Sequence, residues 1–411
     1  MASATLTAFE MALKILYKGT GIEDAIYKQN PFMSILPKYE DFVGYRKRLP
    51  IIYSGNTWSG ALATAQTNRV ASGIEAWELA RINLYSVGRI AKELLEASDS
   101  DRGAVMAAAK IETDSALRTI SRALSCYLFR DGSGAIGADD GTWSTPSTDI
   151  VLSDPADAIN FEPGMTIKSA TGATGAVDTG TIVVESVARA TGTITFTGAV
   201  DSGIAAFAAS DSLFVEGAAY NNSAYAVPMG LDAWVPSSMP SSAAFCGVDR
   251  SVTEKLGGSR YDGSSMGTVE EALINGVNSA DPAAAVDLIV CNNMAFAELV
   301  KEIGSKVQYN RLPVRTTKGA MDIAKFGFKV VEMEGPAGTV RVLSDPHCPK
   351  YTSWAGQLNT AGLHSLKKAV RLDEDDLTVY NADEVEIRCL SRAQFAIQAP
   401  GNWVNITLPS Y

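Results

Sequence analysis

Residues 45–53 read YRKRLPIIY and residues 102–129 read RGAVMAAAKIETDSALRTISRALSCYLF, and these two stretches decide the fold. The first has the composition of a β-strand, and a second strand-like alternation of apolar and polar residues begins at Glu75. The residues between them, 54–73, are mostly small and polar, a composition that favours neither a helix nor a core. We therefore expect an extended hairpin over residues 45–89. It would be too thin to bury a core of its own and would need cover from outside the chain.

The second stretch predicts one long helix. It contains no proline, and apolar residues recur at steps of three and four from Met106 through Ile120 to Leu128. Residues 99–101 (DSD) precede it as candidate N-caps, and residues 131–134 (DGSG) end it. At 1.5 Å per residue such a helix would be roughly 40 Å long, more than a small domain needs. We expect it to run along an elongated molecule.

Composition and charge exclude several classes of protein. The chain has 411 residues, of which 46% are hydrophobic and 20% charged, so it can hold two or three folded domains and is not disordered throughout. Its net charge of −11 argues against nucleic-acid binding as the main source of affinity, although a protein that merely encloses nucleic acid stays possible. Five cysteines without a CxxC pair, no signal-peptide pattern and no long apolar run predict reduced thiols, synthesis in a cytosol and no membrane span.

The remaining chain divides by composition. Residues 1–44 hold short apolar packets between helix breakers, which suits a segment that lies across other surfaces, including those of another subunit. Residues 135–222 are rich in Ala, Gly, Ser and Thr, with short β-runs between turns, and predict a small all-β module. From residue 225 the pattern becomes α/β. Helices are expected at 268–278 and 293–303, and strands at 287–291, 329–333, 339–343, 377–380, 403–408 and, interrupted near Ser391, at 383–399.

Residues suited to catalysis or metal binding are scarce, with only His347 and His364 as histidines. The loop at residues 345–349 (DPHCP) has the composition of a metal or thiol site, but two prolines stiffen it and no second ligand pair is near, so a rigid loop is favoured. The acidic runs at 139–140 and 373–376 lack EF-hand spacing, which favours solvated loops or a charged contact with a partner over cation sites. We expect no cofactor, no metal and no catalytic residue.

The extended hairpin instead carries candidates for contact between subunits. Trp58 is an aromatic residue on a small, polar tip, which favours an intersubunit anchor over a stray exposed side chain. The basic side chains near its base would pair with carboxylates of a neighbour; a strand edge kept from aggregating by its charge is the alternative. The full set of candidates is Arg46, Lys47, Arg48, Trp58, Arg69, Glu75 and Glu78 on the hairpin, with Pro336, Asp373, Glu374 and Asp375 elsewhere.

Further stretches complete an ordered series of parts: residues 42–44 (FVG), 91–98 (AKELLEAS), 229–232 (MGLD), 247–250 (GVDR) and 383–408. In this order, the hairpin, the long helix, the α/β part and the returning strands resemble the major capsid protein of tailed bacteriophages, the Hong Kong 97 type of fold. The resemblance covers nearly the whole chain. It rests on order and length, because none of its motifs is catalytic.

The resemblance implies an α+β subunit without enzymatic activity. Copies would assemble as pentamers and hexamers into an icosahedral or prolate head that encloses double-stranded DNA, in a virion assembled in the host cytoplasm. The implied parts are an N-terminal arm (1–44), an extended β-hairpin or E-loop (45–90), a spine helix with the first part of the P-domain (91–134), a β-rich insertion on the outer face (135–222), an A-domain (223–345), and the second part of the P-domain with a return strand to the A-domain (346–411).

The resemblance also sets expectations for partners. Copies of the chain itself would be the main ones, and DNA would be enclosed without sequence-specific binding. Little chain precedes the hairpin, so a scaffolding protein, if one is needed, is expected to be separate; a portal and a decoration protein are further candidates. Some family members weld their shells through an isopeptide bond from an E-loop lysine. Residues 54–73 contain no lysine, so we expect no such crosslink here.

Two other interpretations are weaker. A cellular compartment of the encapsulin type resembles the same fold, but it would need a pocket for cargo peptides, and the inserted β-module disfavours it. A polysaccharide-acting enzyme would use Asp139, Asp140 and Trp143. Carboxylates on adjacent residues of a strand point to opposite sides, which suits acid–base catalysis poorly.

Overall fold

The computed structural model describes residues 30–55, 59–68, 70–91, 102–219, 225–304, 330–336, 338–367, 369–372 and 384–411. Some features expected from the sequence lie outside these ranges. They are the N-cap at residues 99–101, the strand at 377–380, and the interface candidates Trp58, Arg69, Asp373, Glu374 and Asp375.

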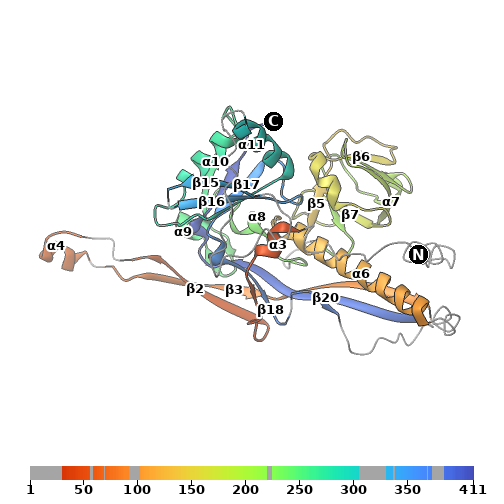
Figure 1. The fold of residues 1–411 in the computed structure, drawn as a ribbon, viewed down its shortest axis with the longest axis horizontal. Coiled ribbons are helices and arrows are strands. Elements are labelled where there is room, and N and C mark those ends of the chain that lie inside the picture. Colours follow the sequence, from red (N-terminus) through yellow and green to blue (C-terminus); the bar gives the residue numbers. More distant parts are fainter. Residues whose placement is uncertain are drawn as a thin grey trace.

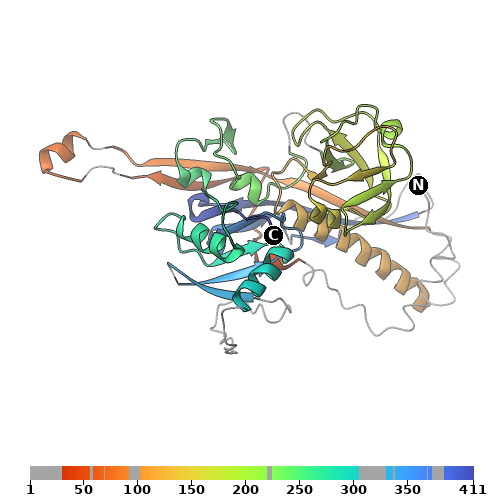
Figure 2. The same ribbon diagram turned by 90° about the horizontal axis from the view of Figure 1, so that it is seen from above.

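The molecule is elongated around one long helix, α6 (Arg102–Tyr127), as Figures 1 and 2 show. A five-stranded sheet lies on one side of α6, and two six-stranded sheets lie on the other side. A two-stranded arm, residues 46–80, extends past one end of the body (Figure 1). The helix expected over residues 102–129 is therefore confirmed, and it does run along the molecule.

The five-stranded sheet is built around β20 (Glu384–Ile397), which pairs antiparallel with β4 (Ile82–Ala91) over most of its length. The strands β1 (Lys38–Tyr39), β18 (Ala361–Ser365) and β19 (Arg371–Leu372) complete it. Ile120 of α6 packs on the sheet against Cys389 and Leu84. The interruption expected near Ser391 was wrong: β20 runs straight through, because Ser391 pairs with Leu84 of β4.

The α/β part is a mixed sheet of six strands in the order β13-β21-β17-β14-β16-β15. Helices α10 (Val269–Asn278) and α11 (Asn293–Gly304) cover one face of it, and Thr268 caps α10 by accepting from Glu271 N at 3.2 Å. The predicted helices and the strands at 287–291, 329–333, 339–343 and 403–408 are confirmed. The strands are β13 (Ser259–Asp262), β14 (Leu288–Cys291), β15 (Val330–Gly335), β16 (Gly338–Ser344), β17 (Thr352–Gly356) and β21 (Trp403–Thr407).

The other six-stranded sheet closes on itself into a small barrel, residues 135–219. Its order is β5-β10-β7-β8-β9-β6, and the two end strands meet through the Asp139–Leu152 bridge and a hydrogen bond from Ser153 N to Ala138 O at 2.9 Å. Buried Ile167, Ile194 and Phe196 belong to its core. Its strands are β5 (Ala135–Ala138), β6 (Asp149–Val151), β7 (Thr166–Ala170), β8 (Ile182–Ala188), β9 (Thr193–Phe196) and β10 (Ser212–Val215), with the short helices η1 (Pro155–Asn160) and α7 (Val200–Gly203).

The described start of the chain packs into the chain's own core. In α3 (Pro31–Ile35) every residue is buried, and the Phe32 ring lies 5.3 Å from that of Phe129, just beyond α6. The sequence suggested a segment lying across other surfaces, including another subunit. For residues 30–36 these surfaces belong to the chain itself, because their apolar side chains fill the junction between α6, β20 and the α/β sheet. Short elements beside this core are α8 (Leu231–Trp234), α9 (Glu254–Gly257), β11 (Ala244–Phe245), β12 (Val248–Asp249), η3 (Leu358–Thr360) and η4 (Pro400–Asn402).

Candidate functional site

The arm consists of β2 (Arg46–Ser54) and β3 (Gly73–Ala80), paired antiparallel so that Leu49 lies opposite Trp77. One face of this ladder, the inner face, packs into the body: Trp77 is completely buried, 5.2 Å edge-on from Trp234. The indole N–H of Trp77 donates to the backbone oxygen of Gln398 at 3.2 Å. The half of the arm nearest the body is therefore part of the core, because the Trp77 ring is buried there and its N–H has a hydrogen-bond partner.

A small hairpin holds the free edge of β3. Strands β11 and β12 are joined by Cys246 and Gly247, both with positive φ (49° and 85°), the geometry that a tight two-residue hairpin needs. The oxygen of Cys246 accepts from Glu78 N at 2.8 Å. This hydrogen bond ties the hairpin to β3 where the arm leaves the body.

The opposite, outer face of the arm begins with charged residues. Arg46 Nη1 lies 3.2 Å from Glu78 Oε2, and Arg48 bonds the other oxygen of the same carboxylate. The two arginine side chains remain 66% and 75% exposed. The sequence led us to expect pairing with a neighbour's carboxylates. In the single chain two positive charges share one negative charge, so the role between subunits stays a prediction.

Lys47 is engaged on the inner side instead. Its Nζ contacts Asp41 and lies 2.8 Å from His364 Nδ1 on β18, whose ring stacks on Tyr39. Burial lowers the pKa of His364, and the Asp41 carboxylate only partly offsets that effect. The same His364 nitrogen lies 3.0 Å from Asp41 Oδ1, so Lys47, Asp41 and His364 together fasten the start of β2 to the five-stranded sheet.

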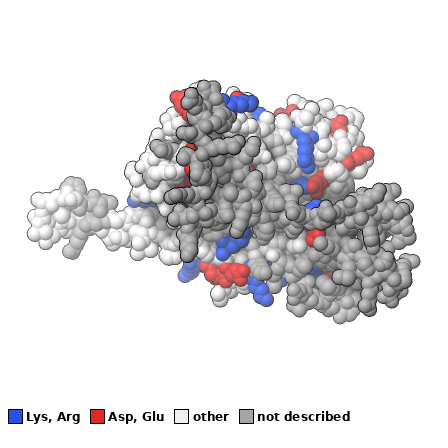
Figure 3. Space-filling view, in the orientation of Figure 1, with Lys and Arg blue, Asp and Glu red and all other residues white. Residues whose placement is uncertain are grey.

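Farther out, the arm loses its contact with the body. Ile52 and Ile74 are cross-strand partners and are 68% and 63% exposed. The tip holds a short helix, α4 (Leu62–Thr67), which the small and polar sequence did not predict. None of its residues is buried and no side chain caps it, and its described residues carry no charge (Figure 3). An isolated helix of six residues is unstable in water, so α4 needs a surface to pack on.

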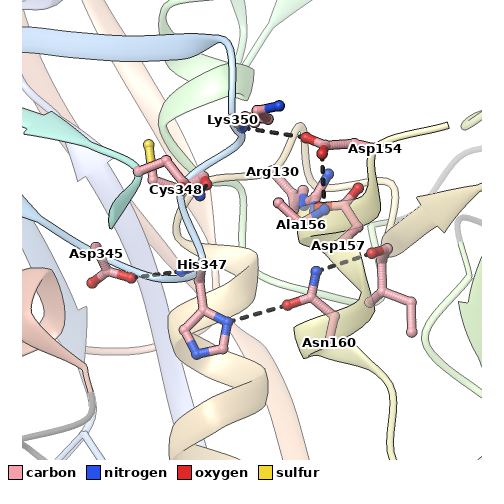
Figure 4. A network of polar contacts seen from close by, with 11 residues as sticks. Arg130, Asp154, Ala156, Asp157, Asn160, Asp345, His347, Cys348 and Lys350 are labelled. Carbon is pink, nitrogen blue, oxygen red and sulfur yellow. Dashed lines mark hydrogen bonds and ion pairs between the residues drawn. The ribbon is translucent and has the colours of Figure 1, made fainter. Parts of the chain in front are cut away.

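The loop at residues 345–349 forms a rigid junction, as favoured from the sequence. Asp345 accepts from Phe32 N at 3.0 Å and from His347 N at 2.9 Å, and His347 Nδ1 lies 3.1 Å from Asn160 Oδ1 in the barrel (Figure 4). Asn160 Nδ2 donates to Ile136 O at 3.0 Å, which leaves its oxygen as the acceptor and His347 Nδ1–H as the donor. The described residues contain no group of three His, Cys, Asp or Glu placed to hold a metal.

Two further contacts tie the barrel to the body at this junction (Figure 4). Arg130, which follows α6, forms an ion pair with Asp157 of η1, and Lys350 N donates to Asp154 at 3.3 Å. Burial raises the pKa of Asp345 to about 6, and burial, with the positive charges of Arg122 and Arg130, lowers that of His347 to about 4. The barrel is thus held by a buried polar network, which orients it firmly.

The remaining candidates occupy separate places. Asp139 is buried and accepts from Gly141 N at 2.9 Å and Ser210 N at 3.0 Å, while exposed Asp140 accepts from Thr142 N at 2.8 Å; both stabilise turns. Trp143 packs edge-on against Phe207 at 4.8 Å. Glu75 is exposed opposite Ile51, and Pro336 is exposed at the tip of the β15–β16 hairpin. Among the described residues, no helix is long and apolar enough to cross a membrane.

No protein-family model and no curated protein matches the sequence, so the comparison rests on solved structures. The capsid asymmetric unit of cyanophage A-1(L) aligns with 93% of this chain and 93% of its own, at 11% identity and a TM-score of 0.51. The chain has a phage-capsid fold of the Hong Kong 97 type. That conclusion agrees with the resemblance read from the order of the parts.

Two other solved structures are similar over most of their length. The capsid of a native GTA particle matches 95% of this chain and 92% of its own at 10% identity, with a TM-score of 0.44. The encapsulin complex of Synechococcus elongatus matches 98% of both chains at 7% identity, with a TM-score of 0.41. At such scores the fold rests on the cyanophage capsid protein alone.

Proposed function

We propose that the protein is the structural subunit of a closed phage-head shell, with copies of itself as its main partners. The observation that carries the proposal is the distal arm. It projects from the body, exposes large apolar side chains, and ends in a helix without a single buried residue. Two strands without a core are not stable alone in water. A neighbouring copy that covers this segment supplies the missing contacts.

Within this proposal the parts take the roles that the resemblance implies. The arm acts as the E-loop, α6 as the spine of the P-domain, the α/β sheet as the A-domain around the symmetry axes, and the barrel as an insertion on the outer face. Each copy offers a different surface to the neighbour on each side, and such heterologous contacts close into rings. Pentamers and hexamers then build a head around double-stranded DNA, in a virion.

No chemical step is part of the proposal. The side chains that could have formed a catalytic or metal site, in the loop 345–349 and around Asp139, are engaged in hydrogen bonds that fix loops and turns. Contact with DNA needs no sequence-specific surface, since a shell confines its contents by closure. A separate scaffolding protein, a portal and a decoration protein remain candidate partners.

Negative-stain electron microscopy with light scattering, on the protein expressed alone, tests the proposal. We expect hollow shells, or rings of five and six copies, for the full chain, and smaller species for a variant in which residues 55–72 are replaced by a two-residue Asn-Gly turn. Shells that form equally well without those residues would contradict the role of the arm. A stable monomer at every concentration would contradict assembly by the chain alone. The diameter of the shells separates a phage head from a small compartment of the encapsulin type.

A further inference from the structure

The two faces of the arm differ in the single chain: the inner face packs into the body, and the outer face is largely exposed. Along β2 and β3 side chains alternate between faces, and directly opposite partners share a face. The inner face carries buried pairs such as Leu49 with Trp77, which pack into the chain's own core. The outer face carries Arg48 with Glu78, then Pro50 with Ala76, then Ile52 with Ile74. Among the described residues, nothing in the chain covers the outer isoleucine pair.

The outer face therefore forms a strip with a charged start and an apolar end. Next to the body, Arg46 and Arg48 share the carboxylate of Glu78. Beyond them, Pro50, Ala76 and the isoleucine pair form one apolar patch. Exposed Leu62 of α4 and Val70 continue the apolar character of the arm toward its tip. A contiguous apolar patch with a polar rim is typical of a protein–protein contact.

We propose that a second copy of this chain lies on the outer face of the arm, centred on Ile52 and Ile74, and that the inner face serves only the chain's own core. The proposal rests on the proposed shell function and names the face that makes the contact. It leaves Glu75, which shares the inner face with Ile51, outside the contact. Glu75 was among the interface residues expected from the sequence.

Charge favours a second copy as the occupant. Residues 45–72 contain four basic residues and no acidic one, whereas the whole chain carries a net charge of −11. Glu78 compensates one of the two arginines at the start of the strip. Another copy of the same acidic chain therefore offers the carboxylates that the second arginine lacks. The arm also points away from the described part of its own body, so none of the described residues covers this patch (Figures 1 and 2).

Neighbouring residues on opposite faces provide a matched test. Ile74→Gln and Glu75→Gln place the same side chain at two adjacent exposed positions, one on each face. We expect Ile74→Gln to raise the protein concentration needed for half-maximal shell formation about tenfold or more, because a buried isoleucine contact is lost. Glu75→Gln should stay within about twofold of the unaltered protein. Light scattering against concentration measures both, and urea unfolding of the monomers shows that both remain folded.

Cysteine labelling gives a second readout that does not depend on assembly yield. Ile52→Cys should react with a maleimide in the monomer and become protected in shells, while Glu75→Cys should react in both; the unaltered protein, whose cysteines are buried or half-buried, gives the background. Equal effects of the two glutamine variants, or protection of Glu75→Cys alone, would overturn the face assignment. A discrete dimer in place of shells or rings would show arm-to-arm pairing and also overturn it. If the unaltered protein forms no shells, the proposed function itself fails.

Discussion

The barrel and the arm are both antiparallel β-structures, but the barrel covers its own strands and the arm does not. The barrel closes its sheet through the Asp139–Leu152 bridge and buries its own core, and among its described residues no large apolar side chain is exposed. The arm has only two strands, and its outer half exposes Ile52 and Ile74. Closure removes the free edges through which β-structures associate, whereas an open ladder keeps them.

The barrel and the arm also differ in charge. Residues 135–219 contain eleven acidic and two basic residues, and residues 45–72 contain four basic and no acidic ones. A highly charged surface of one sign keeps a domain soluble and apart from copies of itself. The comparison teaches that the chain covers the strands of the barrel and leaves the outer half of the arm exposed, and that assembly should respond to the arm far more than to the barrel.

The largest effect on stability is expected in the half of the arm that packs into the body. Trp77→Ala removes a fully buried indole and its hydrogen bond to Gln398, so we expect the free energy of unfolding to fall by about 4 kcal/mol. Urea denaturation of the monomer measures this, with Trp77→Phe as the milder control. A loss below about 1 kcal/mol would mean that the inner half of the arm does not belong to the core.

A second substitution breaks the barrel and leaves the arm intact. Phe196→Ala opens a cavity in the barrel core, and we expect a loss of about 3–4 kcal/mol together with new protease cleavage inside residues 135–219. Ile52→Ala in the arm should change monomer stability by less than about 0.5 kcal/mol. Equal losses from both variants would remove the distinction between the two regions.

The junction that holds the barrel should respond to pH. The pKa of His347 is lowered to about 4 in the folded protein from an ordinary 6.5, so the unfolded chain binds a proton first as the pH falls. His347 therefore stabilises the fold above about pH 6.5, and roughly 3 kcal/mol of that stability is lost by pH 4. Asp345, with its pKa raised to about 6, acts in the opposite direction: its contribution is present at low pH and lost as the pH rises through 6.

Comparison with His347→Gln separates the two contributions, because Asp345 is common to both proteins. Urea unfolding at steps between pH 4 and 7 should show the unaltered protein gaining stability relative to the variant as the pH rises. A constant difference across that range would show that His347 does not titrate there.

The smallest effect is expected at the charged start of the arm. Glu78→Gln removes the carboxylate shared by Arg46 and Arg48, whose side chains are mostly exposed, and surface ion pairs contribute little. We expect monomer stability to change by less than about 1 kcal/mol. Shell formation at low salt should weaken more, since two arginines lose the group that positions them. A large loss of monomer stability would instead mean that the contact of Glu78 with the two arginines contributes to the core.

The parts of the fold that were predictable are those fixed by local patterns. The apolar residues on α6 recur at helical spacing from Leu117 to Leu124, and the strand β14 is a continuous apolar run, so both follow from neighbours in sequence. The positions of β5 and β6 do not follow from local patterns, because Ala-Ile-Gly-Ala and Asp-Ile-Val carry little strand signal and each strand is held by ladder partners distant in sequence.

The candidate site was only partly predictable for the same reason. The basic start of the arm was recognised, but the placement of Leu49 on a buried face and Ile52 on an exposed face depends on Trp234 and Phe245, far along the chain. Likewise, Asp345 caps α3 across 313 residues, and no local pattern links them. The short helix α4 has no apolar face and no capping side chain, so no local pattern predicts it.

The chain enters and leaves the barrel at nearly the same point: a Cβ on Gly134, whose φ is +90°, would lie only 2.0 Å from the oxygen of Ala218. Two ends that touch can be rejoined by a simple turn, so a single insertion or deletion can add or remove the whole barrel while the rest of the chain stays connected. The barrel is in this sense an exchangeable cassette.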